Sequence, residues 1–176
     1  MMTWFFPDQD IIEIHAEQLA ALKLAAAAAP VRRARLCLHH DHADTVQEMV
    51  IAFCRDTYNR PHRHRNKSES FHVIEGRLAI VLFDDAGNPT RQVHLGPPGG
   101  SLPFLYRLSS DRWHAVLPLS EYVVIHETTT GPFELGQTEF ATWSPDGTHH
   151  ERVRHFLARL EGLLNPPASV NYEDAA

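Results

Sequence analysis

The chain has few cysteines, no paired cysteine motif and no long apolar run. Its 176 residues include two cysteines, Cys37 and Cys54, which lie in separate apolar segments. Two isolated thiols of this kind are expected to be buried, reduced side chains rather than a disulfide framework or a zinc site. No segment approaches the ~18 consecutive apolar residues of a membrane span, and the N-terminus has no signal-peptide pattern. These absences predict a cytoplasmic protein without a membrane partner.

The sequence also has fewer basic than acidic residues. The sequence has 16 Lys and Arg against 22 Asp and Glu, which gives a formal net charge of −6. An extended basic patch marks most nucleic-acid-binding domains, so nucleic acid is not an expected partner. The short cluster Arg32-Arg33-x-Arg35 is predicted to be a solvated strand edge, with a phosphate site as the alternative.

The apolar pattern favours a β-rich domain with a helix at each end. Between about residues 33 and 145, short runs rich in Val, Ile, Phe, Tyr and Thr recur between turn signals, which predicts an antiparallel sandwich or barrel. Helical patterns flank this region at about 15–29 and 149–164. We therefore expect one domain over residues 1–164, followed by a polar, disordered tail at 165–176.

Three potential metal ligands lie close together in the segment from Pro61 to Glu69. His62 and His64 are two residues apart, so both imidazoles face the same side of an extended strand. Glu69 follows after four residues, which leaves room for a short turn that returns a carboxylate toward them. Gly76 then stands where a tight turn requires a positive φ. The spacing predicts a metal site on a hairpin.

A fourth ligand should come from elsewhere in the barrel, because one hairpin leaves a cation under-coordinated. His114 is the best candidate, since it begins an apolar strand after a turn. His94 and His126 are the alternatives. Three imidazoles and one carboxylate suit Fe, Mn, Ni, Zn or Cu as a divalent ion, and an octahedral ion would keep about two positions open for water or a substrate.

The spacing of His62, His64, Glu69 and Gly76 resembles the first metal motif of the cupin superfamily, which implies an all-β dominated cupin double-stranded β-helix (jelly-roll barrel). The second cupin motif supplies a histidine from a place comparable to that of His114. Around this histidine the sequence departs from the motif, whose usual glycines and proline are replaced by Pro103, Ser109 and Asp111. Likewise, Asp56 stands where a glycine normally precedes the first histidine.

A narrower resemblance extends from about Arg33 to Pro145, to the WbuC family of cupin-fold metalloproteins. It rests on several segments: Arg35-x-x-Leu38-His39, Val46 to Ala52, Thr57 to His64, Glu69-Ser70-Phe71, Trp113-His114, Glu127 with Gly131-Pro132-Phe133, and Trp143-Ser144-Pro145. The resemblance implies a metal-dependent protein associated with bacterial surface-polysaccharide metabolism, and it does not supply a substrate. Cupin barrels often pair, so it also suggests a homodimer.

Three further residues are candidates for proton transfer. Tyr58 shares strand parity with His62, provided that Pro61 does not interrupt the strand, and His126 and Glu127 lie on a predicted strand. The first hypothesis is a metal-dependent enzyme, of isomerase or epimerase type, acting on a carbohydrate or a related small polar molecule. The alternatives are an Fe(II)-dependent dioxygenase and a non-catalytic, metal-dependent binding protein for a sugar-derived ligand.

Overall fold

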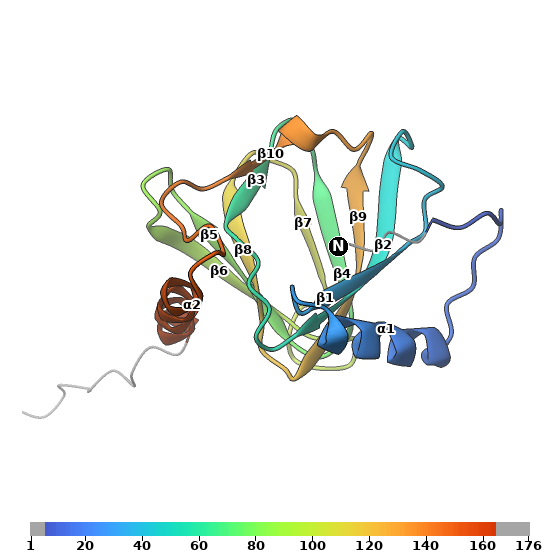
Figure 1. Cartoon of the computed structure of the whole chain (residues 1–176), viewed down its shortest axis with the longest axis horizontal. Coiled ribbons are helices and arrows are strands. Elements are labelled where there is room, and N and C mark those ends of the chain that lie inside the picture. The colour runs from blue at the N-terminus through green and yellow to red at the C-terminus, as the bar shows by residue number, and fades with distance from the viewer. Residues whose placement is uncertain (1–5, 165–176) are drawn as a thin grey trace, which may run out of the picture.

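The structure is a computed structural model that describes residues 6–164, apart from the side chain of Leu135. The predicted tail at 165–176 lies outside the described residues. The elements follow in this order (Figure 1): α1 (Ala16–Ala28), β1 (Arg33–Cys37), β2 (Val46–Cys54), β3 (His62–His64), β4 (Glu69–Glu75), β5 (Leu78–Phe83), β6 (Pro89–Leu95), β7 (Leu105–Leu108), β8 (Trp113–Pro118), β9 (Tyr122–Thr130), the 3-10 turn η1 (Leu135–Gln137), β10 (Thr138–Phe140) and α2 (His150–Leu164).

The strands form two five-stranded antiparallel sheets that face each other. One sheet has the order β1-β2-β9-β4-β7 and the other the order β10-β3-β8-β5-β6. From β3 onward the chain passes repeatedly between the sheets, so most paired strands, apart from β1 with β2 and β5 with β6, are not consecutive in the chain. The predicted jelly-roll barrel with one N-terminal and one C-terminal helix is confirmed.

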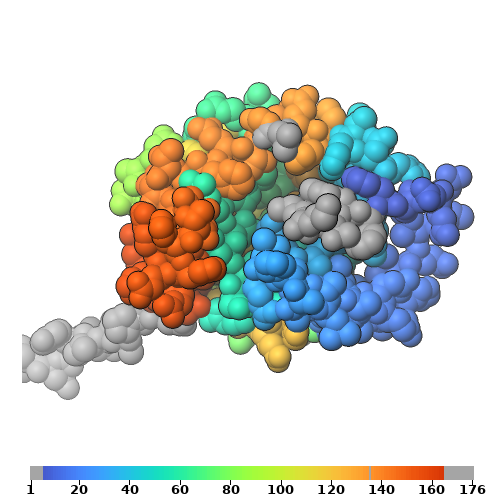
Figure 2. All heavy atoms as spheres, viewed as in Figure 1, coloured from blue at the N-terminus to red at the C-terminus, as the bar shows by residue number. Residues whose placement is uncertain are grey.

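Three apolar clusters hold these layers together. The central cluster lies between the sheets and includes Ile51, Phe53 and Ile80. A second cluster packs α2 against the outer face of β5 and β8, and a third packs α1 against the outer face of β2 and β9. Figure 2 shows the two helices, coloured blue and red-orange, on opposite sides of the molecule. One helix therefore covers the outer face of each sheet, and the central apolar cluster lies in the interior between the sheets.

Some local predictions of the sequence are confirmed and others need correction. Cys37 and Cys54 are buried free thiols, as expected. Gly76 has the expected positive φ, 77°. The strand on which Tyr58 was to share parity with His62 is absent, because β2 ends at Cys54, residues 55 and 56 form a turn, and the chain from there to Pro61 has no strand pairing. Within residues 6–164, no helix has the length and apolar character needed to cross a membrane.

Candidate metal centre

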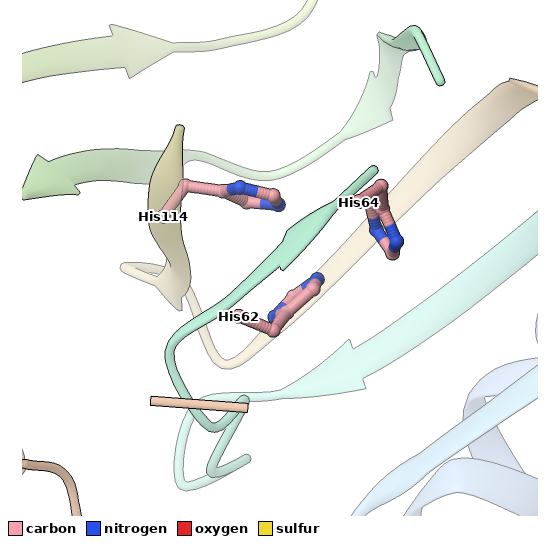
Figure 3. Close-up of side chains that lie close together, drawn as sticks. All are labelled: His62, His64 and His114. Carbon is pink, nitrogen blue, oxygen red and sulfur yellow. The ribbon is translucent and has the colours of Figure 1, made fainter. Parts of the chain in front are cut away.

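The short strand β3 brings the first two histidines into the barrel. It lies between β10 and β8, and His62 is directly opposite His114 of β8 in the register. One ligand nitrogen from each of His62, His64 and His114 lies within 4.8 Å of the other two. Figure 3 shows the three imidazoles pointing toward one another across β3 and β8. The structure thus brings together the three histidines that the sequence predicts as ligands.

The far nitrogen of each ring is anchored, which orients the near one. Nδ1 of His62 donates to the carbonyl oxygen of Arg60 at 2.8 Å, and Nδ1 of His114 donates to that of Arg112 at 2.9 Å. Nδ1 of His64 lies 3.1 Å from Oγ1 of Thr138, which accepts its proton in the matching tautomer. Such anchors fix the ring tautomer and leave Nε2 free to bind a metal.

Glu69 completes the group from the first residue of β4 in the opposite sheet. Its Oε1 lies 2.9 Å from Nε2 of His114, and its Oε2 lies 3.6 Å from Nε2 of His64. Although close, Oε1 of Glu69 and Nε2 of His114 are buried without a hydrogen bond to any described residue. Two ligands bound at about 2.1 Å and at right angles would be about 3 Å apart. The pair is therefore spaced as neighbouring ligands of one ion.

Burial and neighbouring charges shift the pKa values of His62, Glu69 and His114. Burial and the neighbouring His114 lower the pKa of His62 to about 3, so its ring is neutral. Burial alone would raise the pKa of Glu69, but its contacts with His114 and His64 outweigh this effect and hold the pKa below its usual value. Likewise, burial opposes protonation of His114, yet Glu69 raises its pKa. A neutral His62 and an ionised Glu69 are the forms of these side chains that bind a cation.

The alternatives for the fourth ligand lie elsewhere. His94 is opposite Ala79 in the register, on the face of β5 that packs against α2. His126 is opposite Val50, on the face of β2 that packs against α1, and its Nε2 lies 3.5 Å from Oε1 of Glu48. Neither imidazole can reach the site inside the barrel, so the structure selects His114.

A cavity of about 760 Å³ opens beside the histidines. His62, His64 and Glu69 lie in its wall, next to apolar side chains that include Ile51, Phe53 and Phe71. The volume is within the range of about 300–1,000 Å³ that is typical of small-molecule sites. A cation at the histidines would therefore be accessible to a ligand in the cavity.

Of the three residues predicted to transfer protons, the structure brings Glu127 to this cavity. It is opposite Met49 and Phe71 in the register, on the inner face of its sheet, and it lies in the cavity wall. Burial, and then the charge of Glu69, raise the pKa of Glu127. A carboxyl group of this kind suits proton transfer near neutral pH better than an exposed one does.

The other two candidates lie away from the cavity. His126 faces the opposite side of the sheet because neighbouring residues on a strand alternate in direction. Tyr58 belongs to the apolar cluster beneath α2, and its Oη donates to the carbonyl oxygen of Pro145 at 2.7 Å. The parity argument fails for Tyr58 because residues 57–61 are not a regular strand. Neither side chain enters the function proposed below.

Thr138 is a site residue that the sequence analysis missed. It lies 74 residues after His64 and is opposite it in the pairing of β10 with β3. A lone threonine at such a separation gives no local signal, since only the register places its hydroxyl beside the imidazole.

Replacing Thr138 with valine should weaken metal binding, because Nδ1 of His64 then loses its partner. Losses of such supporting contacts typically cost about 10–100-fold in affinity, and we expect roughly 10-fold here. Calorimetric titration of the metal-free protein measures the change. Thr138→Ser keeps the hydroxyl and is expected to bind like the original chain, so equal losses in both variants would contradict the anchoring role.

Comparisons with known proteins identify the architecture. A family model described as a domain of unknown function (DUF6016) matches residues 14–95. A comparison with curated proteins found no match. Among solved structures, an oxalate oxidase in complex with the substrate analogue glycolate is similar with a TM-score of 0.51 and 14% identity, over 77% of this chain and 75% of that one.

The structure of CapF with the inhibitor 3-isopropenyl-tropolone is similar with a TM-score of 0.53 and 17% identity. The match covers 64% of this chain but only 32% of CapF, so this chain corresponds to about a third of that protein. At these identities the likeness concerns the fold, and the narrower WbuC resemblance remains a prediction. Together with the two facing antiparallel sheets, this likeness shows that the chain has the cupin fold.

Proposed function

We propose that this protein binds one divalent metal ion through His62, His64, Glu69 and His114, and that it is a metal-dependent enzyme for a small polar molecule. The observation that carries the proposal is the convergence of three anchored imidazoles within 4.8 Å beside a buried carboxylate. Buried imidazoles with unused nitrogens are costly unless they have a partner, and a cation supplies one. The donor set is compatible with Fe, Mn, Ni, Zn or Cu.

The chain's own residues suggest how a substrate would be handled. When bound, a divalent ion would polarise a substrate oxygen placed at its open positions. Glu127, in the same cavity wall, would take or give a proton at a neighbouring carbon or hydroxyl. The apolar side chains of Met49, Ile51 and Phe71 would limit the access of water to this step. Proton transfer of this type is the chemistry of isomerases and epimerases.

The substrate class proposed is a carbohydrate or a related polyol derivative, as the WbuC resemblance suggests for surface-polysaccharide metabolism. The test combines elemental analysis of protein purified without added metal with a screen of sugar phosphates and nucleotide sugars on the metal-loaded protein. Metal-dependent isomerisation supports the proposal. Substrate-stimulated oxygen uptake would favour the dioxygenase instead, and binding without turnover would favour the binding protein. A protein that retains no metal and gains none on reconstitution contradicts the whole proposal.

Replacing Glu127 with glutamine should separate metal binding from turnover. The amide keeps the size of the side chain but cannot carry the proton, and loss of general acid–base catalysis typically costs about 10²–10⁴-fold in rate. We expect kcat to fall within that range, while the metal content stays at that of the original protein. His126→Gln, on the outer face of the same strand, is the matched control and should leave kcat unchanged. Full activity in Glu127→Gln would exclude this role.

A further inference from the structure

Two arginines of β1 face the cavity, although the sequence analysis predicted a solvated strand edge for them. Arg33 is opposite Phe53 and Arg35 is opposite Ile51 in the register, and both partners belong to the core between the sheets. Paired residues on adjacent antiparallel strands project from the same face, so both arginines project inward. Both lie in the cavity wall with His62 and Glu69. The prediction was wrong because this edge strand borders the cavity rather than open solvent.

Within the described part of the chain, the guanidinium of Arg33 forms no ion pair, and Glu127 is the acidic residue whose charge acts on it. Its Cζ lies 6.0 Å from the centre of the Phe53 ring, and within residues 6–164 the guanidinium makes no side-chain hydrogen bond. Burial, and then the charge of Arg35, lower the pKa of Arg33 to about 10, so it remains charged at neutral pH. The charge of Arg35 therefore disfavours the charge of Arg33, and an anion bound between the two guanidinium groups would be favoured by both.

Glu127 lies between the arginines and Glu69 across the sheet, because β9 is placed between β4 and the pair of β1 with β2. Its carboxyl interacts with Glu69 and His64 on the metal side and with Arg35 and Arg33 on the other. Between Glu127 and Arg33 the interaction is one of charge, without a hydrogen bond between the two side chains. The cavity thus has a metal end and an arginine end, with the Glu127 carboxyl group between them. A ligand that spans the two ends would pass Glu127.

The charge of the whole cavity also favours an anion. Its wall contains three cationic side chains, Arg33, Arg35 and Lys67, and three acidic ones, Glu69, Glu127 and Glu134. A divalent cation at the histidines would therefore leave a net positive cavity. Arginine is well suited to bind a carboxylate or phosphate, because its planar guanidinium donates two parallel hydrogen bonds to two oxygens.

We propose that Arg33 and Arg35 form an anion-binding subsite, and that the molecule bound in this cavity carries a carboxylate or phosphate group held there while an oxygen at its other end faces the histidines. The second part of this proposal, in which the other end of the ligand faces a metal at the histidines, rests on the proposed function. The first part, in which the two arginines bind an anion, does not depend on a bound metal. The substrate class becomes an acidic one, such as a phosphorylated or carboxylated polyol, rather than a neutral sugar.

The test measures anion binding by the full chain after removal of metal, so that the two halves separate. Inorganic phosphate and acetate are titrated in parallel by calorimetry, and these two arms distinguish the phosphate from the carboxylate as the preferred group. We expect millimolar or tighter binding of at least one, and a loss of at least 10-fold in Arg33→Gln and in Arg35→Gln. Arg33→Lys, which keeps the charge without the planar fork, should lose less than Arg33→Gln.

Arg107→Gln is the matched control, since it removes the same charge from an exposed position on β7. It should bind both anions like the original chain. The subsite is excluded if neither anion binds, or if the Arg33 and Arg35 variants, folded by circular dichroism, bind as the control does. Metal affinity, measured separately, should change less than 3-fold in Arg33→Gln. If anions bind but metal does not, the proposed function fails while the subsite stands.

Discussion

Replacing His114 with alanine should lower divalent-metal affinity by more than about 100-fold, because loss of a direct ligand exceeds the cost of about 10–100-fold for a supporting contact. The side chain is 1% exposed, and its Nε2 lies 2.9 Å from Oε1 of Glu69. The substitution therefore removes a ligand and also leaves the Glu69 carboxylate without its nearest partner. Calorimetric titration and the metal content after dialysis measure the loss.

Two further variants make this result specific. His126→Ala removes an imidazole from the outer face of β9 and should leave metal affinity unchanged. His64→Ala removes a ligand whose side chain is 21% exposed, so it should weaken binding with a smaller cost in folding stability than His114→Ala. Metal affinity that survives in His114→Ala, or falls equally in His126→Ala, would contradict the assigned ligand set.

Replacing Gly76 with alanine should strongly destabilise the barrel. Its φ is +77°, and an added Cβ would lie 2.2 Å from the carbonyl oxygen of Tyr122. The left-handed conformation alone costs roughly 1–2 kcal/mol for a residue with a side chain. The close oxygen belongs to the backbone at the start of β9, so relief of the contact requires that strand to shift. We expect a total loss of about 3 kcal/mol or more, equivalent to a Tm lower by about 6–12 °C.

Gly99→Ala separates the two contributions to this loss. Gly99 has a φ of +90°, but an added Cβ would have no neighbour within 4 Å. Its cost should therefore be the conformational one alone, about 1–2 kcal/mol. Thermal and urea unfolding of both variants measure the difference. Equal destabilisation of the two would show that the contact with Tyr122 is relieved without cost.

The sequence predicts those parts of the site that depend on local spacing. The alternation of His62 and His64, the return of Glu69 and the turn at Gly76 each follow from a few neighbouring residues, and all four have the expected geometry. His114 could be chosen because an apolar strand follows it directly. The hairpin predicted to carry His62, His64 and Glu69 is wrong, because β3 and β4 belong to opposite sheets and do not pair. The sequence nevertheless places these residues correctly, since only a short connection separates the two strands.

What the sequence could not provide depends on the pairing of distant strands. His126 and Glu127 are adjacent, so they face opposite sides, but only the register with Met49 and Phe71 shows that Glu127 is the inner one. Thr138 reaches His64 only through the pairing of β10 with β3. Arg33 and Arg35 face the cavity because β1 pairs with β2 at its border. A homodimer and a sugar-derived ligand, which the family resemblance suggests, remain predictions.

The most direct test of the central claim is the crystal structure of the metal-loaded full chain, with anomalous diffraction at the absorption edge of the metal. We predict one ion, bound by Nε2 of His62, His64 and His114 and by the Glu69 carboxylate at distances of about 2.0–2.2 Å. An anomalous peak at another place, with the three imidazoles unligated at saturating metal, would contradict it.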